Sequence, residues 1–434
     1  MHKKQRHMVF LGIGGIGMSA LARHYLRLGS AVFGYDKSRT SITSALELEG
    51  AQICYTEELS EYPGWRPEET TVIYTPAVPK KLAWFNFFKA YSPIKRAQAL
   101  GLIANARKCI AIAGTHGKTS ASSMLVHLMD QAGLDPTAFI GGIMTQTGTN
   151  YRLGNSDFII VEADEFDRSL LYLKPWASAV TTIDEDHLDI YSDKKDLLNT
   201  FDAFVKQTNG PTFTGSTLDR TTQVGSPDNH CWASDIQPQQ GAYSFILHIE
   251  GQTLQTRLHV PGRHNVYNAL LAASLAHHAG VSPEQIASSL PLFKGIKRRF
   301  EFHLQGAKVL IEDYAHHPTE IKSLMDSIDE LYPNEKVCLL FQPHLYSRTR
   351  DFMDGFVQQL SRAEYCLLLP IYAAREQPIV GVNSQVLASS IIGAKVVHEF
   401  DLVAKVKQTQ ASVILVVGAG DVGDFVSPLK EALS

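Results

Sequence analysis

The chain has 434 residues, of which 44% are hydrophobic and 19% are charged. This composition is typical of globular proteins, and the length is enough for two to four domains. The formal net charge is -4, and no basic block is long enough to follow a phosphate backbone. Nucleic acid is therefore not expected as a partner.

Five cysteines lie far apart in the chain: Cys54, Cys109, Cys231, Cys338 and Cys366. Their odd number and the absence of paired metal-ligand spacing predict free thiols in a reducing cytosol. No apolar run approaches the roughly 20 residues that cross a membrane. We therefore expect a cytoplasmic protein without membrane insertion. The sequence leaves the oligomeric state open between a monomer and a dimer.

The N-terminal part begins as a strand, a helix and a second strand. We predict the strands at 8–11 and 31–35 and the helix at 18–28. The turn at 12–17 contains the G-x-G-x-x-G pattern of dinucleotide-binding folds, and Asp36 stands where an acid often holds a ribose. The same turn can hold the diphosphate of a UDP-sugar, or its glycines can serve the turn alone. A strand at 71–74 and an amphipathic stretch at 97–105 follow, and we place the first domain at 1–107.

The segment 110–120 is the most informative of the chain. An apolar strand is followed by a glycine turn and by a Lys-Thr pair that enters a helix. This pattern predicts a loop for a nucleoside triphosphate, in which Lys118 reaches the terminal phosphates and Thr119 offers its hydroxyl to Mg²⁺. The loop is shorter than the common one, because Ile112 stands where a glycine is usual. We expect Lys118 to act as a point charge on the phosphates rather than as a core residue. A plain strand-to-helix turn is the structural alternative.

The rest of the chain alternates strands and helices, which predicts parallel sheets covered on both faces. In the central part we expect strands at 157–161 and 179–183 and a helix at 265–279, with loop or short strands at 210–240. In the last part we expect strands at 309–312, 336–342, 365–369 and 412–417. These elements give a central domain at 108–299 and a C-terminal domain at 300–434.

Polar residues follow several of the predicted strands. Glu162, Asp164 and Glu165 close one strand, and His187 lies among acids after the next. Parallel strands end at the same sheet edge, so these groups can supply Mg²⁺ ligands if the strands are neighbours of the Lys118 loop. Solvated loop acids and a histidine without a ligand role are the alternatives.

Three more segments carry candidate binding residues. Asn265 and Asn268 stand one helical turn apart, so their amides can read an adenine edge, although Asn265 can also cap the helix. The segments 312–320 and 342–350 follow strands and contain histidines. Arg348 in the second segment suits a substrate carboxylate, and capping of surface helices is the competing interpretation.

With these motifs in view, the chain resembles the Mur ligase family along its whole length. The resemblance rests on residues 114–119, Glu162, His187, residues 264–268 and residues 313–318. The segments 12–22, 313–320 and 341–344 are most similar to the alanine-adding branch of the family. The resemblance implies an α/β fold of three domains: an N-terminal Rossmann-like domain, a central P-loop ATPase domain with a mostly parallel sheet, and a C-terminal Rossmann-like domain.

The resemblance also implies a reaction and its cofactors, ATP and Mg²⁺. The lactyl carboxylate of UDP-N-acetylmuramate attacks the γ-phosphate of ATP, and the amine of L-alanine then attacks the acyl phosphate to form an amide in peptidoglycan precursor synthesis. Lys118, Glu162 and His187 are the implied catalytic residues, and Thr119, Glu162 and His187 the implied metal ligands.

The family's binding residues transfer to matching positions of this chain. For ATP they are Gly114, Thr115, Gly117, Lys118, Thr119, Ser120, His264, Asn265, Asn268, Arg299 and Asp313. The two asparagines are implied to contact adenine, Asp313 the ribose and Arg299 a phosphate. For UDP-muramate they are Gly14, Ile16, Gly17, Asp36 and His116, and for alanine Tyr314, His316 and Arg348. Thr182 departs from the family, which usually has asparagine there.

Three other functions stay open at this stage. A nicotinamide-binding protein accounts for the first glycine turn and Asp36 but not for the Lys118 loop. A P-loop ATPase that moves a partner accounts for the loop and predicts hydrolysis without UDP-muramate. A recycling ligase that adds a whole tripeptide to UDP-muramate needs a wider C-terminal pocket.

Overall fold

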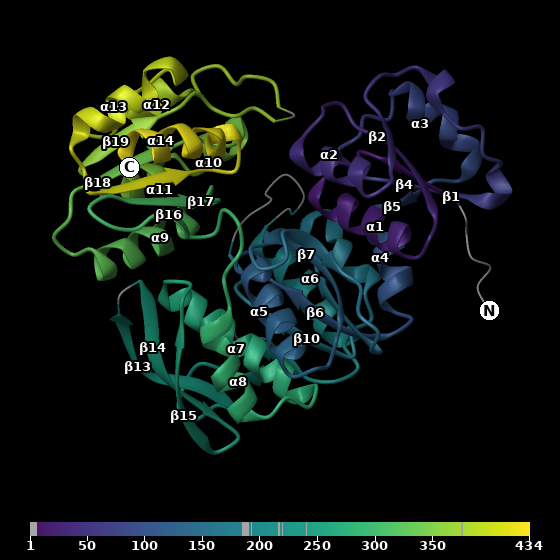
Figure 1. The fold of residues 1–434 in the computed structure, drawn as a ribbon, viewed down its shortest axis with the longest axis horizontal. Coiled ribbons are helices and arrows are strands. Elements are labelled where there is room, and N and C mark those ends of the chain that lie inside the picture. The colour runs from purple at the N-terminus through teal and green to yellow at the C-terminus, as the bar shows by residue number, and fades with distance from the viewer. Residues whose placement is uncertain are drawn as a thin grey trace. The chain divides into compact units, whose positions relative to one another are not determined.

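The computed structural model describes residues 7–184, 191, 193–215, 218, 220–239, 241–374 and 376–434 (Figure 1). It divides into two compact units. Unit 1 comprises Met1–Ser234, Ile246–Thr256 and Tyr267–Phe293, and unit 2 comprises Asp235–Phe245, Arg257–Val266 and Lys294–Ser434. The N-terminal and central sheets both belong to unit 1, and the C-terminal sheet belongs to unit 2. The three predicted domain ranges stay a prediction.

The N-terminal sheet has five parallel strands in the order β3-β2-β1-β4-β5. Its strands are β1 (His7–Leu11), β2 (Ala31–Tyr35), β3 (Gln52–Cys54), β4 (Thr70–Tyr74) and β5 (Ile94–Lys95), and its helices are α1 (Ile16–Arg27), α2 (Ser41–Leu48), α3 (Ala83–Phe87) and α4 (Arg96–Ala104). The chain order reverses between β1 and β4, which is where such sheets bind ligands at the carboxyl ends of their strands. The Rossmann-like prediction is confirmed, and α1 begins two residues earlier than expected.

The central sheet has seven strands in the order β12-β11-β10-β6-β9-β7-β8, and only β8 is antiparallel to its neighbour. The strands are β6 (Lys108–Ala113), β7 (Thr137–Met144), β8 (Thr149–Arg152), β9 (Phe158–Glu162), β10 (Ala177–Val180), β11 (Thr212–Thr214) and β12 (Thr222–Gln223). The helical segments are α5 (Lys118–Gln131), η4 (Phe166–Tyr172), α6 (Lys194–Gln207), α7 (Arg263–His278) and α8 (Pro283–Ser289).

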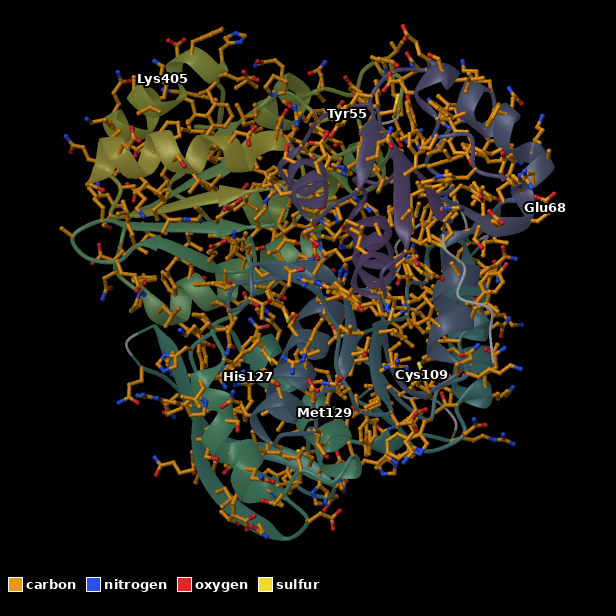
Figure 2. All side chains as sticks on the ribbon, turned by 45° about the vertical axis from the view of Figure 1, so that its right-hand side comes forward. Tyr55, Glu68, Cys109, His127, Met129 and Lys405 are labelled. Carbon is orange, nitrogen blue, oxygen red and sulfur yellow. The ribbon has the colours of Figure 1, made fainter. Side chains whose placement is uncertain are left out.

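Two faces of the central sheet are covered by different helices. Residues 109, 111 and 113 of β6 share a buried cluster with Phe201 and Phe204 of α6. Successive strand residues point to opposite faces, so Ile110 and Ile112 face the other side, and α5 contacts β6, β7 and β9. This explains why β6 is apolar almost throughout. Cys109 and Met129 lie inside the fold and Glu68 and Lys405 are exposed (Figure 2).

The C-terminal sheet has six strands in the order β16-β17-β21-β18-β19-β20, parallel except for the edge strand β16. The strands are β16 (Glu301–Leu304), β17 (Val309–Asp313), β18 (Val337–Phe341), β19 (Tyr365–Leu368), β20 (Lys395–Val396) and β21 (Val413–Val417). The helices are α9 (Pro318–Leu331), α10 (Tyr346–Asp351), α11 (Met353–Leu360), α12 (Ser384–Ser389), α13 (Leu402–Thr409) and α14 (Val426–Leu433). Alternate residues of β21 enter two separate buried clusters, as expected for a sheet covered on both faces.

Two predictions for the central part need correction. The strand expected at 179–183 is β10, which ends at Val180, because Thr181 and Thr182 turn their groups toward the phosphate loop. The segment 210–240, expected as loop or short strands, contains the nine-residue strand β13 (Cys231–Gln239). With β14 (Ala242–Ile249) and β15 (Gln252–Leu258) it forms a separate three-stranded sheet. All five cysteines are free, as predicted, and none of the helices in the described ranges has the length and apolarity to cross a membrane.

Candidate active site

The phosphate loop connects β6 to α5, as the sequence predicts. Gly114 has φ +130° and Gly117 has φ +84°, which only glycine adopts without strain. A Cβ atom at Gly114 would clash with Thr181 Oγ1, and one at Gly117 would lie 2.6 Å from Asn268 Oδ1. Both glycines are therefore required by conformation and by space. Thr119 and Ser120 follow in the first turn of α5.

Lys118 is more than a point charge at the mouth of the helix. Its ammonium donates to Gly114 O at 2.5 Å, to Thr115 O at 3.2 Å and to Glu165 Oε2 at 2.6 Å. The side chains of Lys118 and Glu165 are 16% and 2% exposed. Burial opposes the ammonium, but Glu165, Asp164 and Glu162 outweigh it and raise the pKa of Lys118. Besides the predicted role on phosphates, which stays a prediction, Lys118 therefore ties the loop to Glu165 and has a structural role as well.

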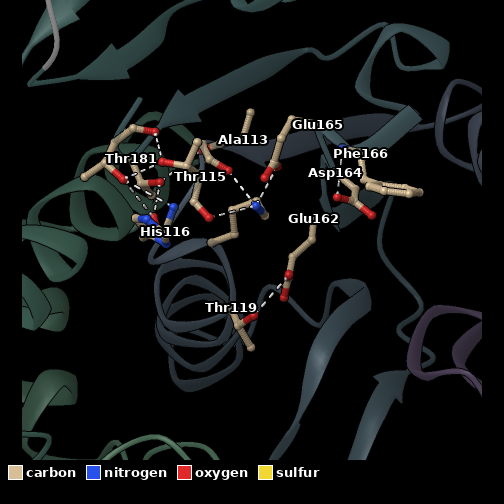
Figure 3. A network of polar contacts seen from close by, with 12 residues as sticks. Ala113, Thr115, His116, Thr119, Glu162, Asp164, Glu165, Phe166 and Thr181 are labelled. Atoms are coloured by element: carbon tan, nitrogen blue, oxygen red, sulfur yellow. Dashed lines mark hydrogen bonds and ion pairs between the residues drawn. The ribbon is translucent and has the colours of Figure 1, made fainter. Parts of the chain in front are cut away.

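Glu162 lies beside the loop, because β9 pairs with β6 and Glu162 is in register with Ile112. Its carboxylate accepts from Thr119 Oγ1 at 3.1 Å, from Ser122 Oγ at 3.1 Å and from the Gly141 amide at 2.5 Å. Figure 3 shows Thr119 pointing toward Glu162. Burial raises the pKa of Glu162 despite these donors and Lys118. The predicted neighbourhood of strand end and loop is confirmed, and a carboxylate next to a hydroxyl suits a divalent cation.

The end of β10 supports the other side of the loop. Thr181 Oγ1 donates to His116 O at 2.5 Å, and the His116 amide donates to Thr182 Oγ1 at 3.2 Å. Thr182, at the position where the family that the sequence resembles usually has asparagine, thus contacts the loop through its hydroxyl. The His116 ring lies 3.6 Å from Asp184. The third predicted metal ligand, His187, lies outside the described residues.

A cavity of about 360 Å³ lies within unit 1 between the glycine turn and the phosphate loop. Its lining includes Ile16, Gly17, Arg96, Lys118 and Glu162. The glycine turn, the Lys118 ammonium and the Glu162 carboxylate thus face one space, which is large enough for part of a ligand.

The glycine turn is bound by one carboxylate, that of Asp36, and one carboxamide, that of Asn150. Asp36 Oδ2 accepts from the Gly14 amide at 2.7 Å, so this acid contacts the turn that the sequence paired it with. The buried Asn150, in the edge strand β8 of the central sheet, donates to Ile16 O at 2.5 Å and to Ser19 Oγ at 3.1 Å, and accepts from Arg23 at 2.5 Å. Sequence reasoning missed Asn150, because nothing in the sequence links it to α1 across 127 residues.

In unit 2, Asp313 binds the backbone of the bent segment that carries Arg299 and precedes β16. Phe300 donates its amide to Asp313 Oδ2 at 2.7 Å, and Ala315 donates to Asp313 Oδ1 at 2.8 Å. Arg299 lies 3.3 Å from Glu320. Burial raises the pKa of Asp313 to about 6, although Arg299 and the two amides oppose this. Asp313 therefore holds the backbone that presents Arg299.

The residues predicted for the amino acid also lie together in unit 2. The rings of Tyr314 and His316 are 5.4 Å apart, and those of His316 and His344 are 5.8 Å apart. Arg348 Nη1 lies 3.5 Å from His344 Nδ1. Burial lowers the pKa of His316, Glu320 opposes this and Arg348 adds to it. The structure thus brings Tyr314, His316 and Arg348 to the carboxyl edge of the C-terminal sheet.

The predicted adenine residues lie in the first turns of α7. Helix α7 begins at Arg263, so Asn265 is inside the helix rather than at its cap. The side-chain Nδ2 of Asn265 donates to Pro261 O at 2.7 Å. Asn265 and Asn268 are both buried. Burial, with Arg299 as a further cause, lowers the pKa of His264 to about 4. One of the points where the chain passes from one unit to the other falls between Val266 and Tyr267, inside α7.

Comparison with known proteins identifies the class to which this fold and site belong. Residues 7–108 match the description Mur ligase family, catalytic domain; residues 112–276 match Mur ligase middle domain; and residues 298–422 match Mur ligase, glutamate ligase domain. The chain belongs to the Mur ligase family.

Two relatives and one solved structure carry the name of a single branch of that family, and a second solved structure carries another name. The protein named "UDP-N-acetylmuramate--L-alanine ligase" from Flavobacterium psychrophilum is 43% identical over 445 residues, which cover 100% of this chain and 99% of that protein. The protein of the same name from Porphyromonas gingivalis W83 is 38% identical over 99% of each chain. The crystal structure of the UDP-N-acetylmuramate-alanine ligase from Thermotoga maritima has a TM-score of 0.84 at 26% identity, covering 98% of this chain and 99% of that one. A murein peptide ligase from Psychrobacter arcticus has a TM-score of 0.74 at 22% identity, covering 99% and 98%.

Proposed function

We propose that the chain joins L-alanine to the lactyl carboxylate of UDP-N-acetylmuramate, with conversion of ATP to ADP and phosphate, in peptidoglycan precursor synthesis. The observation that carries this proposal is the shared cavity of unit 1, which is faced by the glycine turn, by Lys118 and by Glu162. The family is one of ligases, and the relatives with the matching name cover the whole chain.

The chemistry explains why such a site is needed. A carboxylate is a poor electrophile until one of its oxygens becomes part of a good leaving group. Its oxygen attacks the γ-phosphorus and ADP leaves; the alanine nitrogen then attacks the acyl carbon, phosphate leaves and the amine loses its proton. The first step brings two anions together, so positive charge must offset their repulsion.

The central domain supplies that charge. Lys118 binds the β- and γ-phosphates, and Gly114, Thr115, Gly117 and Ser120 complete the loop around them. Thr119 and Glu162 hold Mg²⁺, which fits their 3.1 Å hydroxyl–carboxylate contact, and His187 is the proposed ligand of a second Mg²⁺. Bound Mg²⁺ neutralises phosphate charge during the transfer.

The remaining predicted residues bind and orient the substrates. Gly14, Ile16, Gly17, Asp36 and His116 bind UDP-muramate, and Tyr314, His316 and Arg348 bind alanine. His264, Asn265 and Asn268 contact adenine, Asp313 the ribose and Arg299 a phosphate. Because its substrates are cytosolic metabolites and its thiols are reduced, we place the enzyme in the cytoplasm.

The recycling ligase is the second candidate, and one observation favours alanine over a tripeptide. The relatives between 37% and 43% identical over nearly the whole chain carry the alanine-ligase name. Phosphate release measured with ATP, UDP-muramate and L-alanine, and with each omitted in turn, tests the proposal. Release should require all three substrates. Equal release without UDP-muramate and alanine would contradict it, and faster release with tripeptide than with alanine would favour the recycling reaction.

A further inference from the structure

Three cations that line the cavity of unit 1 are paired with carboxylates of one short segment, residues 164–167, which we name the acidic turn. The pairs are Lys118–Glu165 at 2.6 Å, Arg96–Asp164 at 3.2 Å and Lys95–Asp167 at 2.7 Å. The cations come from two places in the chain: Lys118 begins α5, and the neighbours Lys95 and Arg96 lie where β5 ends and α4 begins. One turn therefore compensates all three of these charges.

The Lys118 pair shows why this arrangement concerns ligand binding. An ammonium has three donors, and in Lys118 they are directed at Gly114 O, Thr115 O and Glu165. The two carbonyls belong to the loop itself, whereas Glu165 is the one carboxylate among them. A phosphate oxygen can bind Lys118 only by taking the place of one of the three, and the replacement of one anion by another keeps the ammonium neutralised.

The acidic turn is also held in a defined position. The Tyr191 hydroxyl donates to Glu165 O at 2.6 Å, and the Phe166 amide donates to Asp164 Oδ1 at 3.2 Å. Asp167 and Arg168 follow with φ +54° and +51°, a left-handed conformation that residues with side chains adopt at a cost. Figure 3 shows Asp164 and Glu165 close to the phosphate loop. These contacts hold the backbone of the acidic turn, so a ligand that reaches the cations would displace the carboxylate side chains and not the backbone.

We propose that the acidic turn stands in for the anions of the substrates. Glu165 holds Lys118 until the phosphates of ATP replace it, and Asp164 and Asp167 hold Arg96 and Lys95 until anionic groups of UDP-muramate replace them. This inference rests on the proposed function, since it takes the cavity as the meeting place of the two substrates.

The proposal has a quantitative consequence. If the free ligase keeps Lys118 on Glu165 most of the time, the apparent Kd for ATP is raised by the inverse of the competent fraction. Glu165→Gln keeps the shape of the side chain and removes its charge, so the competing state is weakened. The variant should therefore bind ATP more tightly than the wild type, although its ligand-free form loses a buried ion pair.

The test is calorimetric titration of a non-hydrolysable ATP analogue with Mg²⁺, without UDP-muramate or alanine. Glu165→Gln should lower the Kd about 3- to 10-fold. Asp196→Asn is the matched control, because Asp196 pairs at 2.8 Å with Arg168, which is not among the cavity-lining cations; its Kd should equal that of the wild type. Asp164→Asn should lower the Kd for UDP-muramate titrated alone and leave the Kd for the ATP analogue unchanged.

The outcomes distinguish a failure of the proposed anion exchange at Lys118 from a failure of the proposed function. Equal or weaker analogue binding by Glu165→Gln, with a folded protein in the thermal melt, would overturn the exchange, because Glu165 would then orient Lys118 for the nucleotide. Should Glu165→Gln fail to fold, Glu165→Asp withdraws the carboxylate by one methylene and must show the same tightening. A wild-type chain that does not bind the analogue would overturn the proposed function, and the exchange with it.

Discussion

Removal of Lys118 should destabilise unit 1 as well as stop the reaction. Lys118→Ala leaves Glu165, whose side chain is 2% exposed, without its cation and also removes the bonds to Gly114 O and Thr115 O. Breaking one side of a buried ion pair costs about 3–5 kcal/mol. Since Lys118 itself is 16% exposed, we expect a loss near the lower end, about 3 kcal/mol.

A double-mutant cycle separates this cost from lost packing. The double variant Lys118→Ala/Glu165→Gln has no stranded charge, so it should recover about 1–2 kcal/mol relative to Lys118→Ala. In thermal unfolding followed by circular dichroism, Lys118→Ala should melt roughly 5–10 °C below the wild type. The control is Lys174→Ala, an exposed lysine of the same unit, which should change the melting temperature little.

Two results would refute this reasoning. A Lys118→Ala protein as stable as the wild type would mean that water reaches Glu165 freely. A double variant as unstable as the sum of its single variants would mean that Lys118 and Glu165 do not interact.

Three other predictions follow from single contacts. Gly117→Ala places a Cβ atom 2.6 Å from Asn268 Oδ1 at φ +84° and should raise the KM for ATP at least tenfold. Gly133→Ala has a similar φ of +76° but open space around it and should leave the KM unchanged. Equal effects of the two variants would exclude the contact with Asn268 as the cause. Asn150→Ala removes the hydrogen bonds to Ile16, Ser19 and Arg23, so it should lower the free energy of unfolding by about 2–3 kcal/mol and raise the KM for UDP-muramate. The control is Asn155→Ala at an exposed position. An unchanged KM in Asn150→Ala would show that the glycine turn does not need this support. Burial, with a contribution from Arg107, lowers the pKa of His24 to about 4, so between pH 6.5 and 4 the unfolded chain binds a proton that the folded chain does not. The free energy of unfolding should therefore fall by up to about 3 kcal/mol over this range. Urea unfolding of His24→Gln should lack this component, and a pH dependence identical to that of the wild type would contradict the prediction.

Local patterns carried much of the prediction. The strands β1, β2, β4 and β6, the phosphate loop and the acids after β9 could be read from the sequence, because apolar runs and glycine turns report the backbone directly. Parallel topology then placed Glu162 beside Thr119, since neighbouring strands end at one edge.

Contacts between distant segments could not be read in this way. Glu165 and Glu162 stand three residues apart in one acidic run, and only the turn after β9 sends Glu165 to Lys118 and Glu162 to Thr119. The sheet of β13–β15 was missed because its strands alternate polar and apolar residues among turn formers, so its composition resembles a loop.

The central claim is that a phosphoryl group moves from ATP onto an organic acid in this site. Transfer of oxygen tests it most directly, because an acyl phosphate leaves one carboxylate oxygen on the released phosphate. With UDP-muramate labelled with oxygen-18 in its lactyl carboxylate, mass spectrometry should find about one labelled oxygen in each phosphate molecule formed with L-alanine. Phosphate free of label, formed at the same rate as the amide, would contradict the account.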